Sequence, residues 1–148
     1  MTIRPVSLSS ETVHATAVAI DGRAVLLGGR PGRGKSDLAL RLIDRGATLI
    51  SDDYTHVRRI DGRAIATAPA NILGKIEVRA VGILELETAQ DVPVALFVDL
   101  EADPPRLPEP GESRMVAGVP IPVAHLAGLE ASAPLKVEAA LKLFGLAV

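Results

Sequence analysis

The sequence predicts an α/β fold with a mixed, curved β-sheet, and three observations support this prediction. Of the 148 residues, 48% are hydrophobic but only 2% are aromatic, so the core has to be built from aliphatic side chains. Such residues are favoured in strands covered on both faces. Two Asp-Gly turns between apolar runs predict β-hairpins, and an amphipathic helical pattern separates two strand patterns. The length suits one domain, so we expect residues 1–148 to form a single catalytic domain.

Two hairpins are predicted in the first half of the chain. Their turns are Asp21-Gly22 and Asp61-Gly62, a dipeptide that favours tight two-residue connections between strands. The strands that they join span residues 13–20 and 24–27 in the first hairpin, and 54–60 and 63–68 in the second.

A helix is predicted between these hairpins, at residues 36–45. Its apolar side chains fall on one helical face, and Gly46 is a favourable residue just after a helix end. A short apolar strand follows at residues 47–50. Together with the strand at 24–27, these elements predict a compact βαβ unit with the first hairpin beside it.

The second half of the chain carries weaker signals. Residues 70–78 are compatible with a short helix, and residues 81–86 and 92–100 with strands. A proline-rich stretch at 103–111 predicts a surface loop, and the prolines at 120 and 122 favour extended backbone over 119–123. The last element is a helix at residues 133–143, with Pro134 in its first turn.

Charge and composition exclude several classes of function. The net charge of −2 provides no basic field for nucleic acid or an anionic membrane. Cysteine is absent, which excludes disulfides and thiolate metal sites and is compatible with a reducing compartment. No apolar run approaches the roughly 20 residues of a membrane span. We therefore expect a cytoplasmic protein.

The segment between the strand at 24–27 and the helix at 36–45 matches the Walker A pattern, Gly-x4-Gly-Lys-Ser, in full. In such loops the backbone N–H groups surround phosphate oxygens, the lysine reaches the terminal phosphates, and the serine hydroxyl ligates Mg²⁺. This pattern predicts a site for ATP and Mg²⁺. The alternative is a glycine-rich turn that binds nothing. The predicted nucleotide-binding residues are Gly29, Arg30, Pro31, Gly32, Arg33, Gly34, Lys35 and Ser36.

Two adjacent carboxylates, Asp52 and Asp53, directly follow the next strand. The end of this strand should lie near the phosphate pocket, so one carboxylate is suited to hold Mg²⁺ and the other to accept a proton. An Asp-Asp turn in solvent is the alternative for such a pair. The residues alone leave open which of the two carboxylates takes which role.

These residues resemble the catalytic domain of bacterial HPr kinase/phosphorylase, in the short form without the usual N-terminal domain. Four elements carry the resemblance over most of the chain. They are the spacing from His14 to Lys35, the ending Gly-Lys-Ser with Asp37 after it, the Asp52-Asp53 pair, and Glu77-Val-Arg-Ala-Val-Gly-Ile83.

The resemblance implies a P-loop kinase domain of the HPr kinase type, with a mixed curved sheet and a P-loop helix. It implies an ATP-dependent serine kinase that acts on the phosphocarrier HPr and forms homo-oligomers. By position, Asp53 would be the acid/base residue, and His14, Lys35 and Arg106 would act in catalysis. Ser36 and Glu77 would be the Mg²⁺ ligands. With Asp53 as the acid/base residue, we assign the other carboxylate, Asp52, to the metal site as well.

The sequence departs from the family pattern at two places, and the second affects the expected direction of the reaction. Ala80 replaces a glycine in the signature, and the stretch 122–128 lacks both arginines of the family's Pro-Val-Arg-Pro-Gly-Arg-Asn loop. That loop resembles the region used for dephosphorylation, so we expect kinase activity to dominate over phosphorolysis. A small-metabolite kinase and a nucleotide-switched binding module remain as alternative functions.

Overall fold

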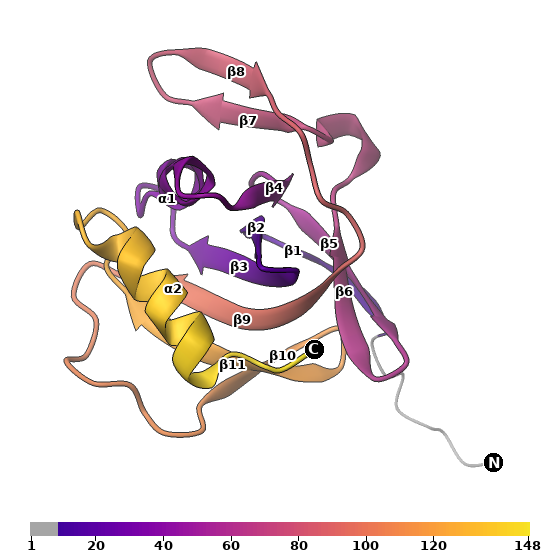
Figure 1. The fold of residues 1–148 in the computed structure, drawn as a ribbon, viewed down its shortest axis with the longest axis vertical. Helices are drawn as coiled ribbons and strands as arrows, with labels where there is room; N and C mark the ends of the chain where they lie inside the picture. The colour runs from indigo at the N-terminus through magenta and orange to yellow at the C-terminus, as the bar shows by residue number, and fades with distance from the viewer. Residues whose placement is uncertain (1–8) are drawn as a thin grey trace.

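The computed structural model describes residues 9–148 as one mixed sheet with two helices, beside a separate two-stranded hairpin (Figure 1). The strands are β1 (Ser10–Val13), β2 (Thr16–Ile20), β3 (Arg23–Gly29), β4 (Thr48–Ser51), β5 (Thr55–Ile60), β6 (Arg63–Thr67), β7 (Lys75–Val78), β8 (Gly82–Glu85), β9 (Val92–Leu100), β10 (Ser113–Val116) and β11 (Val119–Leu126). The helices are α1 (Lys35–Asp44), the 3₁₀ turn η1 (Ala70–Ile72) and α2 (Ala133–Phe144).

The large sheet has the order β1-β5-β6-β9-β3-β2-β4, with β11 beside β9 and β10 beside β11. Strands β3, β9 and β11 run parallel to one another, whereas the other neighbours are antiparallel. The predicted mixed sheet is therefore confirmed. Because parallel strands end at the same edge, Gly29, Leu100 and Leu126 lie at one level of the sheet.

The core consists of two clusters on opposite faces of the sheet. Along β9, Leu96, Val98 and Leu100 pack in the cluster that contains α1 and α2, as expected for alternate residues of a strand. Phe97 points into the other cluster, with residues of β2, β6 and β11. Both faces of β9 are thus covered, which explains why its sequence is a nearly continuous apolar run.

Both predicted hairpins are confirmed. The φ angles are 50° at Asp21 and 76° at Gly22, and 51° at Asp61 and 76° at Gly62. Two consecutive residues with positive φ define the tight turn that matches the twist of the strands.

The first predicted strand, residues 13–20, is interrupted at His14 and Ala15. The Ala15 N–H donates to the carbonyl of Val13 at 2.9 Å, so the chain makes a tight turn there. This turn lets β1 pair with β5 while β2 pairs with β3 and β4. The expected position of His14 within a strand is therefore wrong, because the residue occupies a bend between two strands.

The expected βαβ unit is split. Strands β3 and β4 are joined through α1, but β2 lies between them and pairs antiparallel with both. The hairpin partner β2 already occupies the edge of β3 that β4 would need. The first hairpin is consequently part of this unit and does not lie beside it.

The later elements include both confirmed and wrong predictions. The helix at 133–143 is confirmed as α2, and the strands at 81–86 and 92–100 correspond to β8 and β9. The short helix at 70–78 is wrong beyond its first turn, since β7 pairs antiparallel with β8. Strand β10 was not predicted, and β11 continues to Leu126. Among residues 9–148, no helix has the length and apolar character needed to cross a membrane.

Candidate functional site

The turn between β3 and α1 forms the base of the candidate site. It has positive φ angles at Gly29, Gly32 and Gly34, of 139°, 85° and 85°, which residues with a side chain rarely adopt. A Cβ atom at Gly29 would lie 2.7 Å from the carbonyl oxygen of Leu100, and one at Gly34 would lie 2.7 Å from Leu129 Cδ2. The glycines therefore allow both the turn and its close packing.

A cavity of about 530 Å³ opens in front of the N-terminus of α1. Its lining combines the glycine turn, the first turns of α1, strand β7 and the loop after β11. The lining residues are Gly32, Gly34, Lys35, Ser36, Asp37, Leu40, Glu77, Val78, Arg79 and Leu129.

Two side chains of the first helical turn face groups at the carboxyl ends of the strands. The Lys35 ammonium group donates to the carbonyl of Gly29 at 2.7 Å, across the turn. The Ser36 hydroxyl donates to Asp52 Oδ1 at 2.6 Å. The lysine and the hydroxyl are thus held at the cavity, with the carboxylate behind the serine.

Asp52 is buried, with an exposed fraction of 8%, and is surrounded by donors. Besides Ser36, the Thr16 hydroxyl donates to Oδ1 at 3.1 Å and the backbone N–H of Glu77 donates to Oδ2 at 3.0 Å. Within residues 9–148 its carboxylate forms no ion pair. Three neutral donors therefore fix this buried carboxylate and orient it toward the helix start.

Asp53 lies in a different environment from its neighbour. Its φ of 66° turns the chain, and the Tyr54 N–H donates to the carbonyl of Asp52 at 2.7 Å. As a result Asp53 points outward, where its Oδ1 lies 2.9 Å from His14 Nε2. The two side chains are 55% and 48% exposed, and the His14 ring stacks on Tyr54 with centroids 4.7 Å apart.

The structure brings together most of the predicted site residues. Lys35, Ser36 and Glu77 line the cavity, and Asp52 lies behind Ser36. His14 and Asp53 form a pair that connects to Asp52 through Thr16, whose hydroxyl accepts the backbone N–H of Asp53 at 3.0 Å.

Other predicted residues lie at the margin of the site or outside it. Arg30 and Pro31 are exposed in the middle of the glycine turn, while the carbonyl of Arg33 faces Gly128. Arg106 lies in the exposed loop between β9 and β10 and does not line the cavity. Its side chain makes no hydrogen bond or ion pair with the residues that the structure describes. The predicted catalytic position of Arg106 is thus not supported by its contacts.

Sequence reasoning missed three residues of the site. Thr16 is fully buried and is hydrogen-bonded to both aspartates. The feature of the sequence that could have indicated this role is a single hydroxyl residue in an otherwise apolar strand. Arg79 and Leu129 both line the cavity, although Leu129 follows the glycine turn by almost a hundred residues. Nothing local in the sequence indicates that the loop after β11 folds over the turn.

We predict that Thr16→Val destabilises the protein by about 1–3 kcal/mol. Valine has nearly the same shape as threonine but lacks the hydroxyl that donates to Asp52 and accepts from the backbone N–H of Asp53. A buried polar group that loses its hydrogen-bond partner lowers the stability of the fold. The free energy of unfolding in urea measures the effect. Thr16→Ser is the matched control, because it retains the hydroxyl and should lose much less. A Thr16→Val variant as stable as the wild type would contradict this role.

A glycine turn between a parallel strand and a helix, with a lysine at the helix start and an acidic strand end beside it, is typical of proteins that bind phosphate groups. The family comparison is consistent with this class. Residues 7–92 match the model of the HPr serine kinase C-terminal domain. The chain belongs to this family.

Curated relatives include an HPr kinase/phosphorylase from Clostridium beijerinckii, 40% identical over 55% of this chain and 27% of its own length. Another, from Aromatoleum aromaticum, is 36% identical over 74% of this chain and 40% of its own length. The chain thus spans only about a quarter of the length of the clostridial relatives. Among solved structures, the Hpr(Ser) kinase/phosphatase from Coxiella burnetii is similar, with a TM-score of 0.77 and 26% identity. That match covers 89% of this chain and 88% of the other.

Proposed function

We propose that this chain is a single catalytic domain that transfers a phosphoryl group from ATP to a serine of an HPr-type phosphocarrier. The observation that carries the proposal is the convergence of Lys35, Ser36 and Asp52 at the start of α1, beside a cavity of about 530 Å³. Membership of a kinase family supports the same reaction. The whole-length relatives are named HPr kinase/phosphorylase, which supports HPr as the acceptor.

The residues present fit a nucleotide with a divalent cation. The turn leaves space above Gly32, where a Cβ atom would meet no heavy atom within 4 Å, so the backbone is open to phosphate oxygens. Lys35 is hydrogen-bonded to a carbonyl and not to a carboxylate, which leaves its charge available to an anion. Ser36, Asp52 and Glu77 offer the oxygen ligands that Mg²⁺ prefers. ATP would supply the phosphoryl group, and Mg²⁺ would offset its negative charge.

The protein's own contribution is positioning and proton transfer. Lys35 and the N–H groups of the turn would hold the terminal phosphates, and Ser36 with Asp52 would hold the cation. Asp53 accepts the proton of the incoming serine hydroxyl at its carboxylate. His14, stacked on Tyr54 and paired with Asp53, holds that carboxylate in orientation.

Intact-mass analysis after incubation with ATP, Mg²⁺ and the HPr-type phosphocarriers of the source organism tests the proposal. We expect a mass increase of one phosphate on one phosphocarrier, located on a serine by fragmentation. Nucleotide binding is followed in parallel by calorimetry. Binding of ATP without any phosphoprotein would instead favour a nucleotide-switched binding module, and phosphorylation of a small molecule alone would favour a metabolite kinase.

We also predict that phosphorolysis of phosphoserine-HPr is weak or absent at neutral pH. Reversal requires inorganic phosphate beside a phosphoserine, and two such anions repel unless cations offset them. Among residues 9–148, the basic residues that line the cavity are Lys35 and Arg79. Arg114 stacks on Phe97 at 4.2 Å, so it supplies no charge to the cavity. Rates of both directions on one HPr, with ATP or with excess phosphate, decide the question, and equal rates would contradict the prediction.

The stretch 122–128, which we compared with the family's arginine-containing loop, lies mostly within β11, and the loop beside the glycine turn starts at Ala127. Residues 127–132 contain no lysine or arginine, so the shortage of cations persists. His125 does not compensate, because it lies among three carboxylates. Burial lowers the pKa of His125, but hydrogen bonds to Glu112 and Glu101 and their charges outweigh this and raise it.

A further inference from the structure

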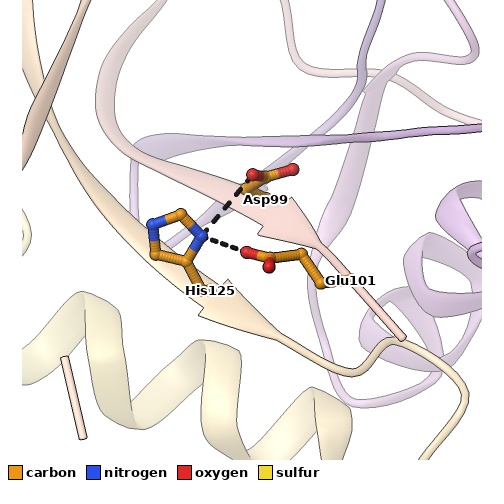
Figure 2. Close-up of side chains that lie close together, drawn as sticks. All are labelled: Asp99, Glu101 and His125. Atoms are coloured by element: carbon orange, nitrogen blue, oxygen red, sulfur yellow. Dashed lines mark hydrogen bonds and ion pairs between the residues drawn. The ribbon is translucent and has the colours of Figure 1, made fainter. Parts of the chain in front are cut away.

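A second cluster of ionisable side chains lies at the carboxyl ends of β9 and β11, outside the proposed nucleotide site (Figure 2). Asp99 and His125 are direct partners in the parallel pairing of these strands. His125 Nδ1 lies 3.5 Å from Asp99 Oδ2 and is hydrogen-bonded to Glu101 Oε2. One potential ligand atom from each of the three residues lies within 4.8 Å of the other two. Two adjacent strands thus hold one imidazole nitrogen and two carboxylate oxygens around one point.

The other nitrogen of His125 is engaged on the opposite side of the ring. Nε2 is hydrogen-bonded to Glu112 Oε2, from the segment before β10. Because a carboxylate accepts, this contact keeps a proton on Nε2. The hydrogen bond to Glu101 likewise needs a proton on Nδ1, and a metal ion bound at Nδ1 would take the place of that proton. Histidines that bind metals usually donate their second N–H to a carboxylate in this way.

The charges of the cluster are not balanced by the protein. Three carboxylates surround a single imidazole, and within residues 9–148 none of them forms an ion pair with lysine or arginine. The side chains are only 24–40% exposed, so water screens their repulsion incompletely. A divalent cation between Nδ1 and the two oxygens would offset this repulsion.

We propose that Asp99, Glu101 and His125 form a binding site for a divalent transition-metal ion, with Zn²⁺ or Mn²⁺ as the fitting ions. One imidazole nitrogen with two carboxylates suits these metals, whereas Mg²⁺ and Ca²⁺ favour sites built from oxygen ligands alone. Glu112 is the positioning residue that orients the ring. The site shares no residue with the proposed ATP and Mg²⁺ site, so it does not depend on the proposed function.

A metal here would fasten the end of β9 to the end of β11. The Glu101 N–H already donates to the carbonyl of Leu126 at 2.9 Å, at the last residue before the loop that packs against the glycine turn. Since the ligands come together only in the folded chain, the ion stabilises the fold by mass action. The site is thus structural, and it acts on the segment that covers the turn.

Calorimetric titration of the nucleotide-free protein with ZnCl₂, and separately with MgCl₂, tests the site. We expect one Zn²⁺ per chain, a raised Tm with Zn²⁺, and no comparable binding of Mg²⁺ at this site. His125→Gln should remove Zn²⁺ binding, and Glu112→Gln should weaken it about 10–100-fold, as expected for the partner of a ligand. His56→Gln is the matched control, because His56 contacts Thr12 and lies outside the cluster.

A measurement on the wild-type protein gives a result that does not depend on whether the variants fold. The chain has only three histidines, so the ring nitrogens of ¹⁵N-histidine-labelled protein can be followed by NMR during Zn²⁺ addition. We expect the resonances of His125 to shift while those of His14 and His56 stay in place. Absence of Zn²⁺ binding, or binding that leaves His125 unshifted, would overturn the proposal. Asp52→Asn should retain Zn²⁺ binding even where phosphoryl transfer is lost, which separates this site from the proposed catalytic one.

Discussion

Lys35→Ala is expected to reduce phosphoryl transfer by at least about 10²–10³-fold, the loss typical for removal of one preorganised charge-stabilising donor. In the structure the ammonium group spans the glycine turn, 2.7 Å from the carbonyl of Gly29, and lines the cavity in front of α1. In the part of the chain that the structure describes, no other lysine lines that cavity. The initial rate of HPr phosphorylation by the variant, relative to the wild type, is the measurement.

The stability of the Lys35→Ala variant should change little, which separates a functional role from a structural one. Loss of the hydrogen bond to Gly29 costs about 0.5–1.5 kcal/mol. A positive charge in the first turn of a helix is unfavourable by about 0.3–1 kcal/mol, so its removal offsets much of that cost. The free energy of unfolding in urea should therefore stay within about 1 kcal/mol of the wild type.

Lys142→Ala provides the matched control for this experiment. Lys142 is an exposed lysine in the last turn of α2 and does not line the cavity. Its replacement should leave transfer unchanged. Normal transfer by Lys35→Ala, with the fold intact, would refute the assignment of the glycine turn as the nucleotide site.

Local patterns predicted the parts of the molecule that depend on local physics. The glycines of the turn after β3 predicted its conformation, and three of them have positive φ angles in the structure. The Asp-Gly pairs predicted the hairpins, and the φ angles of both pairs are positive as well. The position of Asp52 near the glycine turn was predicted because it directly follows a strand whose end was expected near the phosphate pocket. In each of these cases the few residues concerned determine the conformation by themselves.

Other features depend on pairing between distant segments, and the sequence did not reveal them. The break at His14 arises because β1 and β2 pair with different strands, although small apolar and β-forming residues run from Val13 to Ile20 with little interruption. The insertion of β2 between β3 and β4 follows from competition for one strand edge. Arg106 was placed in the site by resemblance alone, and the loop that carries it is exposed and distant in sequence from the glycine turn.

The cluster of His125 with three carboxylates illustrates the same limit. Glu101 and Glu112 precede the histidine by 24 and 13 residues, with no spacing that indicates a metal site. Only the parallel pairing of β9 with β11 places Asp99 opposite His125. A motif search along the chain cannot find ligands that are brought together by register.

Asp53→Asn is expected to retain ATP binding and to lower transfer about 10²–10⁴-fold, the usual contribution of a general base. The amide has the shape of the carboxylate but cannot accept the proton of a serine hydroxyl. Asparagine tolerates the φ of 66° at this position, and its side-chain oxygen can still pair with His14 Nε2. The fold and the orientation of the loop should therefore survive, so a loss of transfer reports on the proton acceptor.

The matched control is Asp61→Asn, which makes the same chemical change at a residue with a φ of 51°, in the turn between β5 and β6. Asparagine is favoured in that turn, so both stability and transfer should remain at the wild-type level. Nucleotide affinity by calorimetry and single-turnover transfer from bound ATP separate binding from chemistry in the two variants. If Asp53→Asn transferred phosphate at the wild-type rate, proton removal would have to be assigned elsewhere. Asp52 is poorly suited to that role, because its oxygens already accept hydrogen bonds from Thr16, Ser36 and the backbone of Glu77.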